Sequence, residues 1–285
     1  MIIALSGSTG FVGQALLQKM RNQSLTVRVI TRESFKKPDQ AFVKEYIEGS
    51  DVVINLAGAP VSKKWTAAYK QEIFDSRVIT TRKISEAINL AQQKPSVFIS
   101  ASAIGIYDSV NTHTESSVAY ADSFLAKVCM AWEREAQNSE PYTRVVIFRT
   151  GLVLGSGGGA LAKMHFPFSI GLGGKIGNGL QPVSFIHLVD LIAAIFFTIE
   201  NHSIRGIVNA VTPYPSDNAE FSEKLAKVFG QTNWLTIPAF ALKMLYGEGA
   251  QILLEGQKVI PGILQQAGFR FKYPTIQNAL VQIYG

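Results

Sequence analysis

The sequence contains a single cysteine, Cys129, which excludes an internal disulfide framework and any multi-cysteine metal site. Charged residues make up only 17% of the 285 residues and hydrophobic residues 47%, a composition that excludes a disordered chain. No Gly-X-Y period is present, which excludes a collagen-like fibre. The length instead predicts one large domain, or one domain with an appendage.

Long hydrophobic runs are also missing. The most apolar stretch, from Phe185 to Ile199, is interrupted by His187 and Asp190 and is shorter than the roughly 20 residues that cross a bilayer. No basic leader precedes the first glycine, so we expect no signal peptide, no membrane partner and a cytoplasmic location. The net charge is +6, but the basic residues are scattered without interleaved aromatic residues. We therefore expect no nucleic-acid partner, since an anionic small ligand explains the charge equally well.

Short runs rich in Val and Ile alternate with longer helical patterns over the first half of the chain, which predicts βαβ units and a parallel sheet buried on both faces. The expected strands are Ile2–Ser6, Thr26–Thr31, Val52–Asn55, Val97–Ala101 and Arg144–Thr150. The expected helices are Phe11–Met20, Thr66–Ala91 and Ser123–Ala136. The predicted fold class is α/β, a Rossmann-type, doubly wound parallel sheet.

The second half is less regular. The glycine-dense stretch from Gly151 to Gly179 predicts a loop without a regular helix or strand. A strand and helix over Pro182–Glu200, a strand at Gly206–Ala210 and a helix over Asn218–Phe229 follow. Beyond Pro238 the chain is mostly helical, and its apolar residues are too many to remain exposed. We expect this smaller C-terminal region to dock as a substrate-binding part or lid; its apolar residues are Phe240, Leu242, Leu245, Ile252, Leu253, Leu254, Ile263 and Leu264.

Three glycines follow the first expected strand, in the stretch Gly7-Ser-Thr-Gly10-Phe-Val-Gly13. In a dinucleotide-binding fold the first glycine allows a tight turn, the second lets the backbone approach a pyrophosphate, and the third lets the helix pack closely on the strand. The helix that begins here offers free N–H groups and the positive end of its dipole. A glycine-rich turn without a ligand is the alternative, but the flanking strand and helix favour dinucleotide binding.

The second expected strand ends in Thr31 and Arg32, where an NAD-specific protein usually carries an acid for the ribose hydroxyls. A guanidinium can bind a 2′-phosphate with two hydrogen bonds, so this position predicts NADP(H). The neighbouring Glu33 favours NAD, and a solvated surface arginine is the remaining alternative. The third strand closes with Asn55-Leu56-Ala57-Gly58, whose small Ala-Gly pair lets the backbone lie against the adenosine half of a cofactor. A simple strand-ending turn is the alternative there.

These motifs resemble the extended short-chain dehydrogenase/reductase superfamily, which includes nucleotide-sugar epimerases. Further stretches narrow the resemblance to its atypical "epimerase family protein" group, relatives of the human short-chain dehydrogenase 39U class: Asn55–Pro60, Trp65 with Lys70–Arg77, Ser100–Tyr107, Arg149–Gly155 and Phe185–Asp190. The tail resembles that group's C-terminal domain of unknown function at Leu253–Pro261, Gly268–Phe271 and Tyr273-Pro274. The resemblance covers nearly the whole chain, and its tail motif is highly specific.

The resemblance implies an NADP(H)-binding domain over residues 1–235, with interleaved substrate segments, and a helical domain over residues 236–285. Together with Gly13 and Gly58 from the motifs above, it places these residues at the dinucleotide: Gly7, Thr9, Gly10, Phe11, Val12, Thr31, Arg32, Leu56, Ala57, Glu72, Arg77 and Val153. Glu72 and Arg77 share the long helix and can border one groove, with Glu72 binding ribose hydroxyls and Arg77 binding phosphate. An exposed ion pair is the alternative.

Oxidoreductases of this superfamily use a Tyr-x-x-x-Lys pair, in which the lysine lowers the pKa of the phenol. When Glu133 is aligned with the glutamate that follows this motif in ordinary epimerases, Leu125 takes the tyrosine position and Cys129 the lysine position. Neither side chain can do this chemistry, and Cys129 is interpreted as a small packing group. Lys127 lies about 200° around the helix from Leu125 and is interpreted as a solvated residue.

Ser102 and Tyr107 are the candidate catalytic residues. Ser102 matches the hydroxyl that holds the substrate oxygen in the superfamily, although a serine that caps a turn explains it equally well. Tyr107 is a candidate substitute acid, as is Tyr120. We expect His187 and Asp190 to hold a loop and cap a helix rather than to catalyse. The other histidines have no partner at ligand spacing, so no metal site is predicted.

Two classes of function remain open. The first is an NADP(H)-dependent epimerase or reductase with an atypical active site, acting on a small molecule such as a nucleotide sugar or another carbonyl or alcohol. The second is a catalytically silent protein that senses NADPH and acts through a protein partner. A substrate-dependent change in cofactor absorbance would separate the two.

Overall fold

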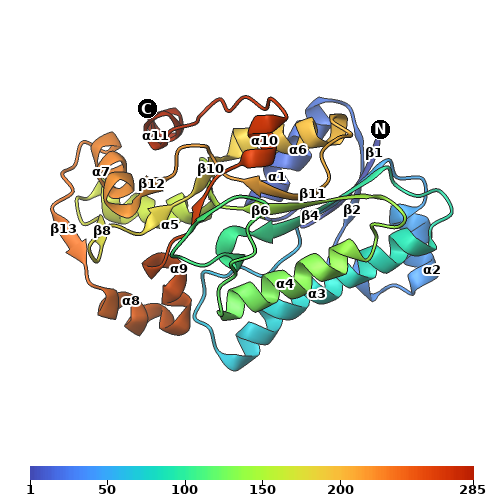
Figure 1. The fold of residues 1–285 in the computed structure, drawn as a ribbon, viewed down its shortest axis with the longest axis horizontal. Helices are drawn as coiled ribbons and strands as arrows, with labels where there is room; N and C mark the ends of the chain where they lie inside the picture. Colours follow the sequence, from blue (N-terminus) through green and yellow to red (C-terminus); the bar gives the residue numbers. More distant parts are fainter.

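The computed structural model describes residues 1–285 and is built around a six-stranded parallel sheet with the strand order β11-β6-β4-β3-β1-β2. Its strands are β1 (Ile2–Ser6), β2 (Thr26–Ile30), β3 (Val52–Asn55), β4 (Val97–Ala103), β6 (Arg144–Thr150) and β11 (Gly206–Ala210). The chain runs outward from β1 to β2 and then crosses back to build the other half from β3 onward (Figure 1). This doubly wound order confirms the predicted fold class.

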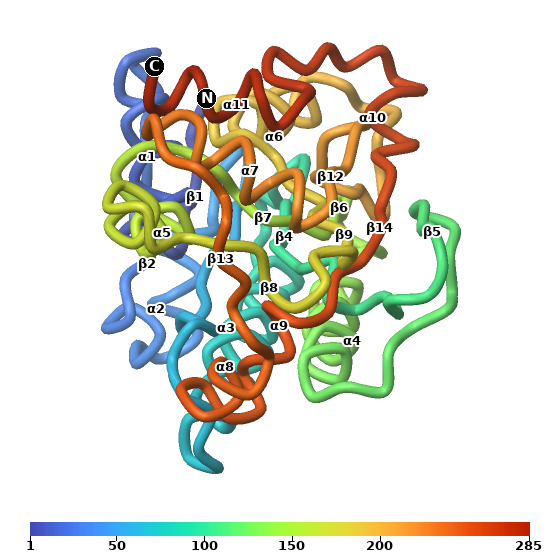
Figure 2. Tube along the Cα trace, turned by 90° about the vertical axis from the view of Figure 1, so that its left-hand side faces the viewer, coloured from blue at the N-terminus to red at the C-terminus, as the bar shows by residue number.

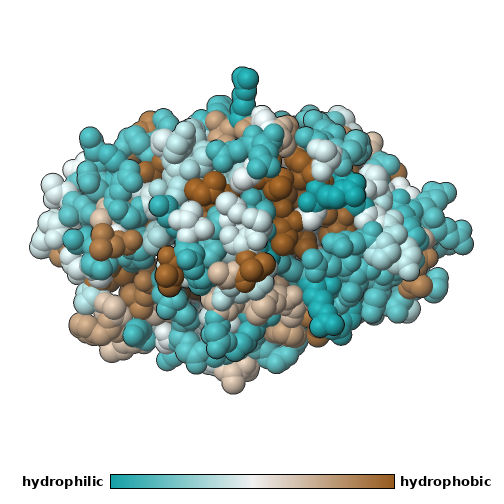
Figure 3. Space-filling model, in the orientation of Figure 1, coloured by the Kyte–Doolittle hydropathy of each residue, from teal (hydrophilic) through white to brown (hydrophobic).

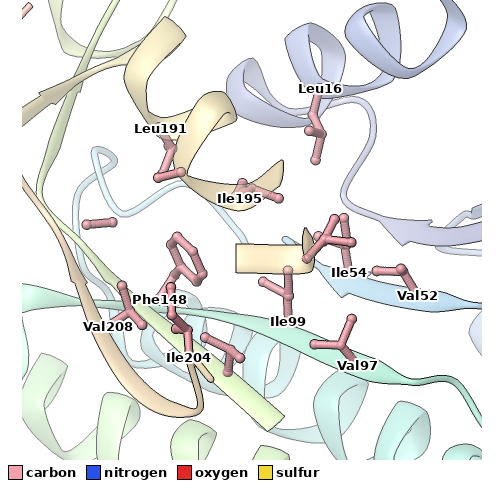
Figure 4. Packing of buried hydrophobic residues seen from close by; sticks show 14 of the residues in the cluster. Leu16, Val52, Ile54, Val97, Ile99, Phe148, Leu191, Ile195, Ile204 and Val208 are labelled. Carbon is pink, nitrogen blue, oxygen red and sulfur yellow. The ribbon is translucent and has the colours of Figure 1, made fainter. Parts of the chain in front are cut away.

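Helices cover both faces of the sheet. On one face lie α2 (Asp39–Phe42), α3 (Ala67–Leu90) and α4 (Phe124–Gln137), and α1 (Phe11–Asn22) and α6 (Leu188–Glu200) cover the other. Leu16 of α1 and Ile195 of α6 approach the sheet at Ile54, Ile99 and neighbouring side chains (Figure 4). These residues are fully or almost fully buried, which is why the strands contain long Val- and Ile-rich runs.

The prediction that Gly151–Gly179 forms no regular structure is wrong. The segment contains β7 (Leu152–Leu154), which pairs with β10 (Phe185–His187), then α5 (Gly159–Ser169), and β8 (Gly174–Ile176), which pairs with β13 (Leu235–Ile237). The glycines are concentrated in the connections, whereas residues 160–166 are mostly apolar helix formers. The helix therefore forms between two glycine-rich turns.

The remaining elements are short, except for α7 and α11. They are η1 (Ser34–Lys36), η2 (Val43–Ile47), η3 (Ile104–Ile106), β5 (Thr112–His113), β9 (Pro182–Val183), β12 (Ser216–Asp217), α7 (Asn218–Val228), α8 (Ala239–Tyr246), η4 (Gly247–Ala250), α9 (Gln251–Leu254), β14 (Lys258–Val259), α10 (Gly262–Gln266) and α11 (Ile276–Tyr284). The C-terminal part is mostly helical, as predicted. No helix of the chain combines the length and the apolar character needed to cross a lipid bilayer.

The tail crosses the whole molecule, from α8 through β14 to α10 and α11 (Figure 2). Leu264 of α10 joins the main core, and Leu280 of α11 packs with residues of α5 and α7. The expected docking therefore occurs, but not through all the apolar residues. Phe240 and Leu245 of α8 are 72% and 63% exposed, because this short helix buries only Leu242.

Main-chain groups of the tail are held by side chains of the main body. Ser184 Oγ donates to the Gln257 carbonyl at 2.7 Å, and Asn209 Nδ2 donates to the Ile260 carbonyl at 3.1 Å. The carboxylate of Asp190 accepts the N–H groups of Lys272 and Tyr273 at 2.8 and 2.9 Å. The tail is thus part of the folded unit and reaches the sheet at β11.

Candidate functional site

One face of the sheet changes from apolar to polar at the carboxyl ends of its strands. The register places Ser6 beside Asn55, Ser102 beside Arg149, and Arg149 beside Asn209. Residues aligned across neighbouring strands point to the same side of a sheet, so these side chains form a polar row along its edge. The carboxyl edge of an open parallel sheet is where ligands bind in this class of fold. The candidate site is therefore built on this row.

The glycine loop after β1 leaves backbone donors without partners. Gly7 has a φ of +73°, and a Cβ at position 13 would lie 2.1 Å from the Gly7 carbonyl oxygen, so both positions require glycine. Gly10 is the N-cap of α1 and has no side chain to cap the helix. The N–H groups of Phe11, Val12 and Gly13 therefore have no acceptor in the protein. The loop presents three free donors at the positive end of a helix, as an anion site requires.

The turn after β2 presents one unpaired cation. Strand β2 ends at Ile30, one residue earlier than predicted, because Thr31 turns back to hydrogen-bond with Ser34. Arg32 is exposed and has no ion-pair or hydrogen-bond partner. Glu33, which favoured NAD in the sequence, forms an ion pair with Lys36 at 2.8 Å. The Glu33 carboxylate therefore has a cationic partner of its own, and the guanidinium of Arg32 has none.

Arg77 on α3 lies against the turn after β3. Its guanidinium donates to the carbonyls of Ala59 and Ile73 at 3.0 and 3.1 Å and stacks on Trp132, 5.3 Å from the ring centroid. A Cβ at position 58 would lie 2.9 Å from the Arg77 Cζ, so the guanidinium lies directly against this turn. Burial lowers the pKa of Arg77, and no carboxylate pairs with it. A half-buried cation without a counter-ion favours an anionic ligand.

Glu72 lies on the same side of α3 as the residues that hold this turn. Tyr69 donates through its hydroxyl to the Pro60 carbonyl, and the Ser76 hydroxyl accepts the N–H of Ala59 at 2.9 Å. Glu72 is one helical turn from both, and its carboxylate is exposed and unpaired. Glu72 and Arg77 form no ion pair with each other, which excludes that alternative in this structure.

A second glycine-rich stretch closes on the first through Phe11. A Cβ at Gly158 would lie 2.3 Å from the Phe11 ring, and Gly155 and Gly159 contact the same ring. These glycines connect β7, which carries Val153, to α5. Phe11 and Val153 therefore lie where the helix of the first loop meets the start of α5.

Leu125 and Cys129, which the alignment sets at the positions of the Tyr-x-x-x-Lys pair, lie in apolar surroundings on α4. Leu125 is half-buried and lies beside Gly105, and Cys129 is 3% exposed. Burial raises the pKa of the Cys129 thiol to about 11, with the Glu133 carboxylate adding to the shift and Arg77 opposing it. The thiol is therefore neutral near pH 7. Lys127 points to solvent and pairs with Asp122, as expected of a solvated residue.

Ser102 belongs to a buried polar cluster. Its hydroxyl donates to Glu133 Oε1 at 2.6 Å. Arg149 donates to the same carboxylate from Nε at 2.8 Å and from Nη2 at 2.7 Å. Burial by itself lowers the pKa of Arg149, but the hydrogen bonds and charge of Glu133 raise it above its usual value. The Ser102 hydroxyl is thus committed to Glu133 as a donor, and it remains an acceptor.

Two tyrosines flank the Arg149 guanidinium. Tyr107 is fully buried; its hydroxyl contacts Asn209 Oδ1 at 2.9 Å and the Thr114 carbonyl at 3.1 Å, and burial raises its pKa. Tyr120 is 38% exposed, and its hydroxyl accepts one long bond from Arg149 Nη2 at 3.4 Å. Of the two, only Tyr120 has a hydroxyl with spare capacity near the surface. A catalytic role for Ser102 or Tyr107 stays a prediction.

His187 and Asp190 have the positions expected of structural residues. His187 is the N-cap of α6, with Nδ1 accepting the N–H of Val189, and Asp190 holds the tail backbone. No three His, Cys, Asp or Glu side chains gather as a metal-ligand set. Sequence reasoning missed the Glu133–Arg149 pair, the link from Asn209 to the tail, and the contact of Phe11 with Gly158. The one signal for them in the sequence is the Arg149-Thr-Gly stretch, which belongs to a family motif.

Two family models match the chain. The model described as "NAD dependent epimerase/dehydratase family" matches residues 3–210, and the model described as "Domain of unknown function (DUF1731)" matches residues 237–283. The first covers more than half of the chain, from β1 to the end of β11.

Individual relatives match over nearly the full length. The chain is 39% identical to the "Epimerase family protein SDR39U1 homolog, chloroplastic" of Arabidopsis thaliana, over 98% of this chain and 86% of that protein. It is 37% identical to an epimerase family protein of Staphylococcus saprophyticus, over 97% of both chains. The crystal structure of human epimerase family protein SDR39U1 (isoform 2) with NADPH aligns with a TM-score of 0.92 at 31% identity, covering 100% of this chain and 99% of the other.

Proposed function

The chain belongs to the NAD dependent epimerase/dehydratase family, and we propose that it binds NADP(H) and exchanges hydride with a small carbonyl or alcohol substrate such as a nucleotide sugar. The observation that carries the proposal is the combination of three free N–H donors on α1 with two cations, Arg32 and Arg77, that have no counter-ion. A dinucleotide carries phosphates that satisfy both kinds of group.

The residues present fit such a cofactor. Gly7 and Gly13 keep the loop flat enough for a pyrophosphate to approach the free donors, which Gly10, Thr9 and Val12 border. Leu56, Ala57 and Gly58 would lie along the adenosine half, with Thr31 and Arg32 at its ribose. Phe11 and Val153 would flank it where α1 meets α5. Glu72 and Arg77 lie on the far side of the turn that Gly58 forms.

The preference for a 2′-phosphate rests on Arg32. Its guanidinium is exposed and unpaired, while Glu33 is engaged by Lys36. The solved human relative, 31% identical to this chain, contains NADPH, which supports the same choice. An acid in place of Arg32 would instead repel the phosphate.

The nicotinamide of a bound cofactor supplies hydride exchange, and the protein must supply the proton and the positive charge. Arg77 stacks on Trp132, which lies one helical turn beyond Cys129 on α4, so it places a cation from α3 near the position where the motif lysine would stand. Tyr120 is the better-placed proton donor, because its hydroxyl is partly exposed and meets Arg149, whereas the hydroxyl of Tyr107 is buried and has two partners. Ser102 can accept a hydrogen bond from a substrate hydroxyl.

A second function is favoured by one specific observation. Leu125 has no titratable group, the Cys129 thiol is neutral, and Ser102 donates to Glu133, so the usual acid-base set is absent from its usual positions. This arrangement favours a catalytically silent protein that binds NADPH and, in its bound state, acts through a protein partner. Under either function, we propose that residues 1–235 form the cofactor-binding domain and residues 236–285 the C-terminal helical domain.

Cofactor choice is tested by titrating NADPH and NADH against the unaltered protein and Arg32→Ala, following nicotinamide fluorescence. We expect NADPH to bind more tightly, and Arg32→Ala to weaken NADPH by about 10- to 150-fold, in line with roughly 1.5 to 3 kcal/mol for a charged hydrogen bond. NADH affinity should change little. Arg270→Ala, which removes another exposed arginine without an ion-pair partner, is the matched control. Equal affinities of the unaltered protein for NADPH and NADH would refute the NADP(H) assignment.

The two functions are separated by absorbance at 340 nm with aldehydes and ketones as substrates, and by product analysis with nucleotide sugars, since epimerisation returns the hydride and leaves the absorbance unchanged. Turnover that falls in Tyr120→Phe while NADPH affinity is kept supports the enzyme. Tight NADPH binding without turnover on any of these substrates supports the silent protein.

A further inference from the structure

The loop that leads from β3 into α3, residues 60–66, begins beside the proposed cofactor. Its first part is held by α3, since Tyr69 donates to the Pro60 carbonyl and Arg77 donates to the Ala59 carbonyl next to it. Trp65, 8% exposed, donates to the Val61 carbonyl at 2.9 Å and closes the loop on itself. We call residues 60–66 the entry loop. It follows closely on Leu56-Ala57-Gly58, which we place along the adenosine half of the cofactor.

Two elements from the second half of the chain, α5 and η4, touch the entry loop. Lys163 of α5 donates to the Ser62 hydroxyl at 2.8 Å and to the Ser62 carbonyl at 3.2 Å. Gly249 of η4 packs so closely that a Cβ there would lie 3.3 Å from Trp65 Nε1. An ion pair between Glu248 of η4 and Lys70 of α3 stands next to this contact.

Both views of the chain show this meeting point, with the segment that follows α8 beside the segment that precedes α3 (Figures 1 and 2). The space-filling view gives the setting: hydrophobic residues gather across the middle of this face, between hydrophilic regions (Figure 3).

The two polar contacts, Lys70–Glu248 and Lys163–Ser62, cost little free energy to break. The Lys70 and Glu248 side chains are 27% and 66% exposed, so water and salt weaken their attraction. The bonds from Lys163 to Ser62 also lie at the surface. By contrast, Asp190 and Ser184 hold the rest of the tail through buried groups. The meeting point at the entry loop can therefore open while the tail stays docked.

We propose that the entry loop, α5 and η4 form a latch over the dinucleotide, closed by Lys163–Ser62 and Glu248–Lys70, that must open for the cofactor to enter and to leave. The inference rests on the proposed binding of NADP(H). In the proposed binding mode the cofactor lies between Leu56–Gly58 and Val153 with the start of α5, and Lys163 of α5 reaches across to Ser62. We expect the latch to set the rate of exchange rather than the affinity, because Lys163, Ser62, Glu248 and Lys70 are not among the residues that would hold the cofactor.

Stopped-flow fluorescence with NADPH tests the latch on the full chain. Association is followed after mixing with NADPH, and release is followed by displacement with excess NADP⁺. In Glu248→Gln and in Lys163→Ala we expect both rate constants to rise about two- to fivefold, the range for exposed ion pairs, with the dissociation constant within about twofold of the parent. Raising the salt concentration should speed release from the parent and have less effect on Glu248→Gln.

Glu135→Gln is the control, because it removes an ion pair with Arg82 that joins α3 to α4 away from the entry loop; the Glu135 side chain is 13% exposed. Its exchange rates should equal those of the parent. Unchanged rates in the Glu248→Gln, Lys163→Ala double variant would overturn the latch while leaving the proposed function intact. Weaker affinity with unchanged association would also overturn it, since these residues would then bind the cofactor. A parent protein that binds no NADPH would instead refute the proposed function itself.

Discussion

Replacing Glu133 by Ala should destabilise this protein more than any surface change, because it leaves a buried cation unpaired. The Arg149 side chain is 1% exposed and that of Glu133 is 7% exposed, and two hydrogen bonds join them. The carboxylate also accepts the Ser102 hydroxyl. Breaking a buried pair by removing one partner costs about 3 to 5 kcal/mol, out of the roughly 5 to 15 kcal/mol that keeps a domain folded.

Two further variants separate charge from packing. Glu133→Gln keeps the shape and can still accept from Ser102, so it should lose less, about 1.5 to 3 kcal/mol for a charged hydrogen bond. The double variant Glu133→Leu, Arg149→Met removes both charges together, and it should be more stable than Glu133→Ala alone. Urea unfolding followed by circular dichroism gives the free energy of each variant.

The control is Asp122→Asn, which breaks the ion pair with Lys127 on the outside of α4. Those side chains are 91% and 65% exposed, so the loss should stay below about 1 kcal/mol. A Glu133→Ala protein within about 1 kcal/mol of the parent would show that the Arg149 charge finds another partner, and the reasoning from burial would be wrong. A double variant less stable than Glu133→Ala would contradict that reasoning as well.

Two other predictions follow from buried groups. Burial raises the pKa of Cys129 to about 11, so iodoacetamide should leave the thiol unmodified in the folded protein at pH 8. Cys129→Ala should keep the NADPH dissociation constant within about twofold. Fast alkylation, or loss of a measured activity with affinity and folding intact, would mark a reactive thiol instead. Asp190→Asn removes the charge and one of the two carboxylate oxygens that accept the N–H groups of Lys272 and Tyr273. Amide exchange at these two residues should speed up by about 10- to 150-fold, as a loss of about 1.5 to 3 kcal/mol implies. Asp217→Asn, at a helix N-cap elsewhere, should leave the two amides unchanged. Unchanged exchange in Asp190→Asn would show that the tail does not depend on this carboxylate.

Local patterns predicted the first half of the chain well, because each element there carries its own signal. The strand bounds Ile2–Ser6, Val52–Asn55 and Arg144–Thr150 agree with the structure to the residue. The helix predicted over Thr66–Ala91 begins one residue later, since Thr66 serves as its N-cap. Parallel strands buried on both faces must be rich in branched apolar residues, and this requirement is visible in sequence.

Glycine content misled the prediction for the second half. The stretch Gly151–Gly179 contains α5 because its glycines serve the two connections, at Phe11 and at the turn before β8, rather than the helix between them. Whether a glycine interrupts a helix or allows a close contact depends on the residue that packs against it in the folded protein. That neighbour is Phe11, more than 140 residues away in the chain.

The sequence by itself determined the doubly wound sheet, the glycine loop at the start of α1, the presence of an arginine after β2 and the absence of a Tyr-x-x-x-Lys pair. Each of these features depends on residues a few positions apart in the chain, so the local sequence determines it. Only the tertiary structure decided that Ser102 is bound to Glu133, that Tyr107 is buried while Tyr120 is partly exposed, and that Arg77 lacks a counter-ion. Hydrogen bonding and burial of these groups depend on strands and helices brought together by packing, and no local pattern records which polar groups will meet there.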